Sequence, residues 1–374
     1  MTLDSRPWQN AALVVGATLL ILTACTPEAP TPSASPTSAS PAPTPDPTIA
    51  PASAPEPRLD LTCDDLAASL PLSTTFPSAV STRSRAQTEY GAHPSWPEEY
   101  KVRSVGGLVC EFSNGEPQSR VRGSNPAYVG ARILVLPDPG SQWDAFVATY
   151  GVSGTRLVSC FPDSGATSCS FDALGADRWV DVSIAGAVSE TAGVALGDAV
   201  LAAVTSAGPG AATWTPPAGT LAVPDACTDY ISNTALQTAT GFAAPFILGS
   251  RSTGGGGFSL HAGAEEINGS PSCLWAFESS DSGVGTLKVL RGGEWAWAEA
   301  QTIVGSTPIT VAGLAADDEA WLRCGPSDAW CVVDLVLGGN WIELYLWEDD
   351  PGVPLDRRAA VQNIAIVVVA NVTP

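Results

Sequence analysis

Residues 169–184 read CSFDALGADRWVDVSI, and residues 331–346 read CVVDLVLGGNWIELYL; the two stretches align without a gap. In each, a run of strand-forming residues leads into a short turn segment, at Gly175 in the first stretch and at 338–340 in the second. A second run follows, in which apolar residues alternate with other residues. Alternation with a period of two is typical of a strand with one apolar face. Each stretch therefore predicts a β-hairpin with one buried face.

Three pairs of residues with chemically similar side chains occupy the same places in the two stretches. They are Asp172 and Asp334, Trp179 and Trp341, and Asp181 and Glu343. We expect the two tryptophans to be core or supporting residues.

Eight cysteines follow residue 57, and they form two sets of four. In order, the members of the second set lie 164, 163, 164 and 162 residues after those of the first, a regularity that independent placement would rarely produce. The chain therefore looks duplicated. The sets are Cys63, Cys110, Cys160 and Cys169, and Cys227, Cys273, Cys324 and Cys331.

Both sets sit in the same order of predicted elements. Each begins with a short helical pattern at its first cysteine, continues with a strand at its second, and then has a further strand, a Trp-bearing helix and the hairpin. Each closes with a long apolar segment that favours a helix, although the second is so rich in Ile and Val that a strand is an alternative. The first helices start near 63 and 227, and the strands at the second cysteine cover 108–113 and 272–277. The further strands cover 131–137 and 287–291, the Trp-bearing helices start near Trp143 and Trp295, and the closing segments cover 194–205 and 359–370.

This pattern predicts an α+β fold with two tandem repeats, each an antiparallel sheet with packed helices and two disulfides. We place the repeats at residues 58–213 and 214–374, joined near Pro216 and Pro217. Each is of ordinary size for a domain with its own core.

The amino terminus has the pattern of an export signal. Residues 11–22 are uncharged and apolar but too short to span about 30 Å of hydrocarbon, so they match the apolar region of a signal peptide. The tetrapeptide at 22–25, Leu-Thr-Ala-Cys, resembles the bacterial lipobox. That resemblance implies cleavage of a lipoprotein signal peptide at residues 1–24 and attachment of lipid, including palmitate-type acyl chains, to Cys25. An ordinary secretory signal is the alternative.

Residues 25–57 predict a disordered linker behind the anchor. Of the 32 residues at 26–57, 11 are Pro, 10 are Ser or Thr and 7 are Ala, a composition that cannot build a core. The linker would hold the folded part away from the membrane.

Export makes disulfides the expected state of the eight cysteines. If each repeat pairs its own cysteines and both pair alike, three schemes remain. We choose first with second and third with fourth in each repeat, because the third and fourth cysteines are only nine and seven residues apart and suit a clip between adjacent strands. Geometry has to decide between the schemes.

The charge excludes one large class of function. The chain has 17 Lys and Arg against 38 Asp and Glu, a net charge of -21, and only two lysines, Lys101 and Lys288. Binding of nucleic acid requires clustered basic residues, so a nucleic-acid partner is excluded. No zinc-ligand spacing and no hydrolase or nucleotide-binding motif occurs in the sequence, so we expect neither a metal nor a cofactor.

Several other residues were weighed as site candidates. His93 and His261 could act as general bases, but we interpret both as loop histidines. The acidic runs at 317–319 and 348–350 lack the pattern of a calcium loop, and the glycines at 254–257 lack the setting of a phosphate cradle.

Trp295 and Trp297 are the candidate ligand-binding residues. They lie two positions apart in a predicted helix and so point in nearly opposite directions, and we therefore expect at least one of them to be exposed. An exposed aromatic face could stack on a sugar or anchor a partner.

The lipobox, the Ser/Thr/Pro linker and the cysteine order together resemble cell-envelope lipoproteins of actinobacteria. They resemble more loosely the two-disulfide extracellular sensor domains of mycobacterial receptor kinases. The resemblance implies a lipid-anchored protein on the outer face of the cytoplasmic membrane. It would act as a non-catalytic sensor or adaptor that binds an envelope protein or cell-wall ligand. The alternative is an envelope enzyme that acts on cell-wall material through an unrecognised site, with polar residues of perturbed pKa in only one repeat.

Overall fold

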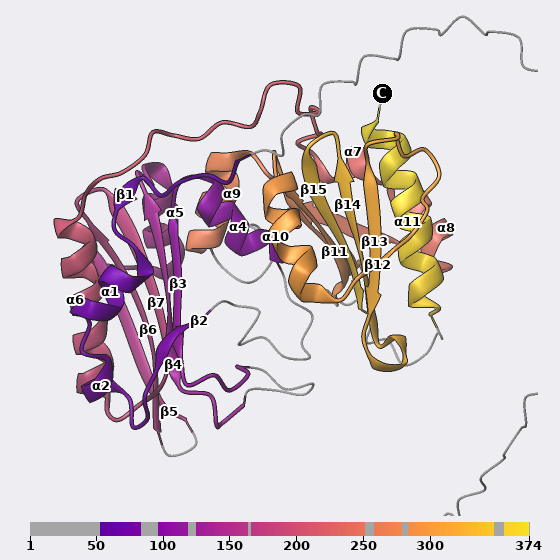
Figure 1. The fold of residues 1–374 in the computed structure, drawn as a ribbon. Helices are drawn as coiled ribbons and strands as arrows, with labels where there is room; N and C mark the ends of the chain where they lie inside the picture. The colour runs from indigo at the N-terminus through magenta and orange to yellow at the C-terminus, as the bar shows by residue number, and fades with distance from the viewer. Residues whose placement is uncertain are drawn as a thin grey trace, which may run out of the picture. The chain divides into compact units, whose positions relative to one another are not determined.

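The computed structural model describes residues 53–83, 96–118, 125–163, 166–250, 258–278, 283–347 and 355–373. Residues 50–374 group as one compact unit. The fold contains three antiparallel sheets and packed helices (Figure 1). It is α+β, which confirms the predicted fold class. We call residues 58–213 the first half and residues 214–374 the second half.

The first half contains a six-stranded sheet with the order β2-β3-β4-β7-β6-β5. A separate two-stranded sheet joins β1 (Leu59–Asp60) to β8 (Gly208–Pro209). The strands of the larger sheet are β2 (Ser81–Arg83), β3 (Leu108–Ser113), β4 (Gly130–Pro137), β5 (Arg156–Asp163), β6 (Ala166–Gly175) and β7 (Arg178–Ala187).

The second half contains a seven-stranded sheet with the order β12-β13-β14-β15-β11-β10-β9. Its strands are β9 (Phe246–Ser250), β10 (Ser272–Phe277), β11 (Gly283–Leu290), β12 (Thr307–Pro308), β13 (Glu319–Cys324), β14 (Trp330–Leu337) and β15 (Asn340–Trp347). Apart from the short edge strand β12, this sheet has the same strand order as the first when both are followed along the chain.

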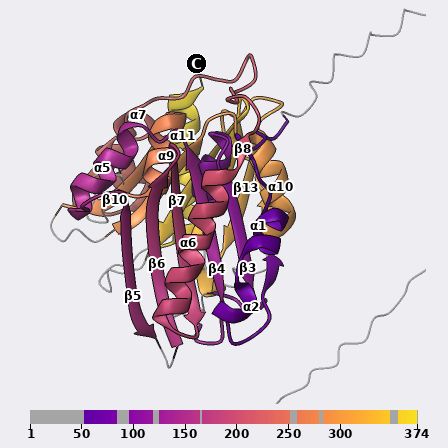
Figure 2. The same cartoon turned by 90° about the vertical axis from the view of Figure 1, so that its left-hand side faces the viewer.

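Helices from the same half cover one face of each sheet. In the first half α6 (Glu190–Ser206) lies along the sheet beside α1 (Cys63–Ser69) and α2 (Leu72–Thr75), as Figure 2 shows. In the second half that face is covered by α7 (Cys227–Tyr230), α8 (Asn233–Thr240) and α11 (Arg357–Val372).

Both closing segments are helices, so the strand alternative for the second was wrong. Helix α11 turns Val361, Ile364, Val368 and Val372 toward the sheet, at the spacing of a helix face, and this burial outweighs the strand preference of Ile and Val. Within the described residues, no helix has both the length and the apolar character needed to cross a membrane.

The opposite faces of the two sheets are covered as well. Four helices lie there: α4 (Trp96–Ser104) and α5 (Ser141–Tyr150) from the first half, and α9 (Leu260–Asn268) and α10 (Glu294–Val304) from the second. The prediction of a hairpin with one buried face was therefore wrong for the second half. Nearly every residue of β14 and β15 is buried, because helices pack against both faces of this sheet. In the first half it holds for β7, where Val180, Val182 and Ile184 are buried and the residues between them are only partly buried.

Each predicted hairpin turns through two residues with positive φ. In the second half they are Gly338 and Gly339, as predicted, with φ of 50° and 82°. In the first half Gly175 is the last residue of β6, and the turn is made by Ala176 and Asp177 with φ of 49° and 55°. The prediction of a turn at Gly175 was thus wrong by one residue, because the two-residue hairpin places the left-handed positions after it.

The four disulfides join the predicted pairs. In each half one bond links the first helix to the second strand of the main sheet, and one links two adjacent strands directly across from each other. The bonds are Cys63–Cys110 and Cys160–Cys169 in the first half, and Cys227–Cys273 and Cys324–Cys331 in the second.

Candidate functional site

Each hairpin places two carboxylates directly opposite each other on neighbouring strands. Asp172 of β6 is opposite Asp181 of β7, and Asp334 of β14 is opposite Glu343 of β15. A tryptophan at the start of the second strand supports each pair. Trp179 Nε1 donates to Asp172 Oδ1 at 3.0 Å, and Trp341 Nε1 donates to Asp334 Oδ1 at 3.0 Å. Trp179 and Trp341 are fully buried, which confirms them as supporting residues.

In the second half the chain itself neutralises the acidic pair. Arg323 Nε donates to Asp334 Oδ2 at 3.2 Å and Arg323 Nη2 donates to Glu343 Oε2 at 2.9 Å, so one guanidinium bridges both carboxylates. Lys288 of β11 is directly opposite Glu343 in the sheet. All four charged side chains are buried. Two cations thus face two acids in a closed polar core.

In the first half the corresponding positions carry no positive charge. The position of Arg323, next to the third cysteine of the set, is Ser159, and the position of Lys288, opposite the second acid, is Leu134. Arg132 is diagonal to Asp181 across the β4–β7 ladder, and it forms an ion pair with Glu99 at 3.4 Å. Among the described residues, no side chain donates a hydrogen bond to Asp181.

Burial raises the pKa of acids in both pairs, including Asp334, where the attraction of Arg323 opposes the shift. Burial, followed by repulsion from Asp181, raises the pKa of Asp172 to about 7, although the hydrogen bond from Trp179 opposes the shift. Burial also raises the pKa of Asp181, against the attraction of Arg132. Each carboxylate therefore affects the titration of the other.

A row of hydroxyls borders the acidic pair on the same face of the sheet. Ser159, Ser170, Ser183 and Arg132 are paired across β5, β6, β7 and β4, one step along the sheet from the acids. Ser159 and Ser170 are exposed, and Ser183 and Arg132 are partly exposed. The matching row of the second sheet is entirely buried, and it consists of Arg323, Val332, Tyr345 and Thr286.

The first half therefore has a partly exposed polar row where the second half has a filled core. Two carboxylates beside three small hydroxyl side chains can accept hydrogen bonds from an ammonium or guanidinium group. The bridging geometry of Arg323 in the second half shows that one guanidinium can serve both acids of such a pair. Since the pKa of Asp172 is about 7, this acid could also donate or accept a proton.

The predicted exposure of Trp295 or Trp297 was wrong. Both lie on α10, but Trp295 is 5% exposed and Trp297 is 2% exposed. Trp295 packs edge-on against Tyr100 of α4, with the guanidinium carbon of Arg103 4.9 Å from its ring, while Trp297 packs against Trp341 and Trp321. Because α10 is covered on two sides, side chains that point in opposite directions from it both contact other residues of the protein.

The remaining sequence candidates are not brought together. Cys25, His93 and the segments at 254–257 and 348–350 lie outside the described residues. The interpretation of His261 as a loop histidine was wrong, because it lies on α9 and is half-buried. In the run at 317–319, Asp318 accepts backbone hydrogen bonds from Ala315 and Gly338, so this acid stabilises loops.

One group of potential metal ligands occurs among the described residues, at Cys324, Asp328 and Cys331. The sulfurs of Cys324 and Cys331 are bonded to each other, which removes the thiolates that a metal would need. Asp328 instead forms an ion pair with Arg358 at 2.9 Å.

Sequence reasoning aligned Asp172 and Asp181 with Asp334 and Glu343 but assigned them no role. A usable signal was present: acids inside otherwise apolar strands are rare in a core, and here they occur at the same place in both hairpins. The alignment of the hairpins did not include the strand next to each of them, and that strand brings Arg323 to one acidic pair and Ser159 to the other.

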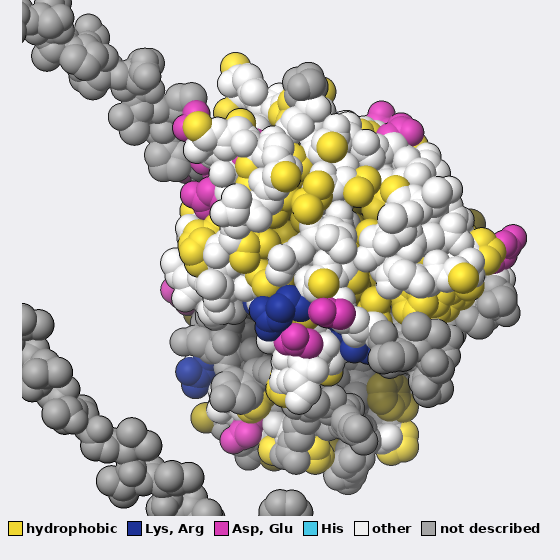
Figure 3. All heavy atoms as spheres, turned by 90° about the vertical axis from the view of Figure 1, so that its right-hand side faces the viewer, with side chains coloured by type: hydrophobic (Ala, Val, Ile, Leu, Met, Phe, Trp, Pro, Cys, Tyr) yellow, Lys and Arg dark blue, Asp and Glu magenta, His cyan; other side chains and the backbone are white. Residues whose placement is uncertain are grey.

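The acidic side chains do not form one continuous patch on the face that Figure 3 shows. In the view of Figure 3, the described surface is mostly apolar or uncharged, basic and acidic side chains meet near its centre, and other acidic side chains are scattered along its edges.

Comparison with known proteins adds no identity, because no protein-family model, no curated protein and no solved structure matches the chain.

Proposed function

We propose that the protein is a lipid-anchored binding module on the outer face of the cytoplasmic membrane. It would recognise a cationic group of an envelope partner through Asp172 and Asp181. The observation that carries the proposal is the partly exposed acidic pair, which no guanidinium of the described residues bridges, whereas Arg323 bridges its counterpart in the second half. The second half supplies this cation from its own chain, and a partner would supply it to the first half.

The charge of the acidic pair and the space beside it both support binding of a cationic group. A partner that supplies a guanidinium or ammonium group lowers the pKa of both acids and removes their mutual repulsion, so binding relieves an unfavourable interaction of the free protein. The exposed Ser159 and Ser170 leave room for a side chain at the place that Arg323 fills in the second half.

A titration with N-acetyl-arginine amide, followed by NMR and calorimetry at pH 7.5, tests the site. Because the whole chain is acidic, the matched control matters: Asp60→Asn/Asp144→Asn removes the same charge from exposed positions of the first half. We expect that control to bind like the wild type and Asp172→Asn/Asp181→Asn to lose at least tenfold in affinity. Equal affinities for the two double variants would reject the site.

The anchor rests on the amino-terminal motif at residues 22–25. With two acyl chains or more, membrane attachment is stable, because each buried methylene contributes about 0.8 kcal/mol. We expect the wild-type chain in the membrane fraction with acyl groups on Cys25, and Cys25→Ser in the soluble fraction. A soluble wild-type chain of unmodified mass would reject the anchor.

The shared strand order and matched disulfides also support the proposal that the chain arose by duplication. After duplication one hairpin would have kept an internal cation and the other would have opened to a partner. This division explains why only one of the two acidic pairs is partly exposed.

One observation favours the alternative of an envelope enzyme: Asp172 has a pKa of about 7 and is opposite a second ionisable acid. Such a pair supplies a general acid and a general base in the same site. Incubation with purified peptidoglycan, with products identified by mass spectrometry, decides between the two functions. Products that form with the wild type and not with Asp172→Asn would establish the enzyme.

A further inference from the structure

Strand β5 forms an edge of the six-stranded sheet, and no strand among the described residues pairs with its outer side (Figure 2). Just before β5, Thr155 O accepts a hydrogen bond from Leu174 N of β6 at 2.9 Å. The backbone groups of successive residues in an antiparallel strand point in alternate directions, so those of Arg156, Val158 and Cys160 point away from β6. This edge therefore offers a row of backbone donors and acceptors to a further strand.

The matching edge of the second half is covered by the chain itself. Strand β13 contains the third cysteine of its set, as β5 does, and β12 pairs with its outer side. Just after β12, Ile309 N donates to Ala320 O at 2.9 Å, and Arg156 occupies the place of Ala320 in β5. The chain between the preceding helix and this strand comprises residues 305–318 in the second half but only 151–155 in the first. The shorter connection supplies no strand at the place of β12.

The open edge lies beside the acidic pair. Ser159 of β5 is exposed and lies on the same face of the sheet as Asp172. Phe161, two residues further along β5, points to this face as well and is 54% exposed. A side chain of an added strand would cross Ser159 to reach Asp172 on the second strand away. Arg323 spans the same number of strands, because it starts on β13 and donates to Glu343 on β15.

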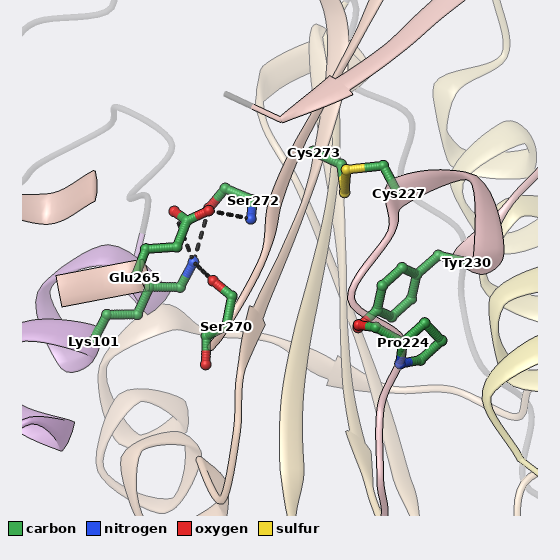
Figure 4. Close-up of a disulfide and its surroundings, with 8 residues drawn as sticks. All are labelled: Lys101, Pro224, Cys227, Tyr230, Glu265, Ser270, Ser272 and Cys273. Atoms are coloured by element: carbon green, nitrogen blue, oxygen red, sulfur yellow. Dashed lines mark hydrogen bonds and ion pairs between the residues drawn. A yellow bond between two sulfur atoms is a disulfide. The ribbon is translucent and has the colours of Figure 1, made fainter. Parts of the chain in front are cut away.

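Within the described residues, few cations of the chain are left to serve this edge in a second copy. Lys101 is buried, and its Nζ donates to Ser272 Oγ at 2.8 Å and to Glu265 Oε2 at 3.3 Å (Figure 4), while Lys288 is buried opposite Glu343. Ion pairs with acids of the same chain engage Arg58, Arg103, Arg132, Arg156, Arg291, Arg323 and Arg358. The net charge of -21 also repels a second copy, so a cationic partner fits this edge better.

We propose that the outer edge of β5 binds an extended, cationic segment of the partner as an additional antiparallel strand. This inference rests on the proposed function of the acidic pair. Backbone hydrogen bonds to Val158 and Cys160 hold the segment, and an arginine or lysine opposite Ser159 directs its side chain toward Asp172. An apolar residue two positions earlier in the segment lies against Phe161. The edge thus gives affinity for an extended chain, and the acids select its cation.

The acetylated heptapeptide amide TVTRTVT, titrated into the full chain at pH 7.5, tests the inference by NMR and calorimetry. It carries the same single charge as N-acetyl-arginine amide, but backbone hydrogen bonds to β5 should make it bind at least tenfold more tightly. Methylation of the backbone nitrogens of the two threonines next to the arginine removes the N–H groups that face β5 and should abolish this gain. Methylation of the two valines instead alters N–H groups that face away and should preserve it. Equal affinities for the two methylated peptides would overturn the inference.

The same titrations separate this inference from the proposed function. If N-acetyl-arginine amide binds at Asp172 and Asp181 but the heptapeptide binds no more tightly, the acidic site stands and strand addition is rejected. If neither compound binds, both proposals fail.

The choice of a cationic occupant is tested separately. We expect the heptapeptide to bind Asp172→Asn/Asp181→Asn at least tenfold more weakly than the wild type, and equal affinities would show that the acids do not select the segment. Light scattering during size-exclusion chromatography should show the wild type as a monomer. A wild-type dimer that the heptapeptide dissociates would show that the edge takes a second copy, which contradicts the inference.

Discussion

The two hairpins share their strand pairing and the position of their acids but differ in what faces those acids. In the second half Arg323 bridges Asp334 and Glu343 within a buried core. In the first half Ser159 occupies the position of Arg323, and the pair Asp172 and Asp181 is only partly covered. The comparison teaches that one arrangement of carboxylates is structural when the chain supplies the cation and becomes a candidate recognition site when it does not.

The largest expected difference between the halves lies in the loss of Arg323. Arg323→Met leaves two buried acids without their guanidinium and should lower the free energy of unfolding by about 3–5 kcal/mol. The matched change in the first half, Ser159→Ala, should stay within about 0.5 kcal/mol of the wild type. Urea unfolding followed by Trp fluorescence measures both. A loss below about 1 kcal/mol for Arg323→Met would show that the network contributes little.

Neutralising one acid in each half should have effects of different size at pH 8. Asp172 has a raised pKa in the folded state, so the stability linked to its proton is present below about pH 4 and is lost as pH rises toward about 7. Asp172→Asn should therefore be more stable than the wild type at pH 8, by about 2 kcal/mol for a partly exposed group, and should lose this advantage at pH 4. Burial also raises the pKa of Asp334, but Asp334→Asn removes the charged acceptor of Arg323, so this variant should gain less stability at pH 8 than Asp172→Asn. Thermal melts of both variants at several pH values would show equal gains if the comparison is wrong.

Transfer of the missing cation should make the first half resemble the second. Ser159→Arg places a guanidinium beside Asp172 and Asp181, which lowers the pKa of Asp172 and should increase stability at pH 8 by about 1–2 kcal/mol. It should also prevent binding of N-acetyl-arginine amide. Ser159→Gln, which adds length without charge, is the control, and an equal gain from Gln would contradict the electrostatic explanation.

The smallest expected effect concerns the hairpin turns. Ala176 has φ of 49° where the second half has Gly338, and the left-handed conformation costs an L-residue about 1–2 kcal/mol. Ala176→Gly should therefore stabilise the protein by about 1 kcal/mol. Gly338→Ala should destabilise it by more than that, because the added Cβ would lie 2.5 Å from Leu221 Cβ. Chemical unfolding of the two variants checks the sign of each change.

Much of the fold could be predicted from local patterns, and the site could not. The cysteine spacing predicted the four disulfides, and the apolar runs predicted β3, β10 and both closing helices. The exposure of Trp295 depends on Tyr100, which is nearly 200 residues away in sequence and comes from the other half. Periodicity within one helix carries no information about such a neighbour. The same limit applies to Asp172, because its partial exposure and its lack of a bridging cation depend on Ser159 of the adjacent strand.

The state of Asp172 and Asp181 is the most direct test of the account. Carboxyl ¹³C NMR of the wild-type chain, assigned with Asp172→Asn and Asp181→Asn, would follow both acids from pH 3 to 9. We expect one proton to leave the pair near pH 7 and N-acetyl-arginine amide to move this step to lower pH. Two carboxyls that both titrate near pH 4 and ignore the ligand would contradict it.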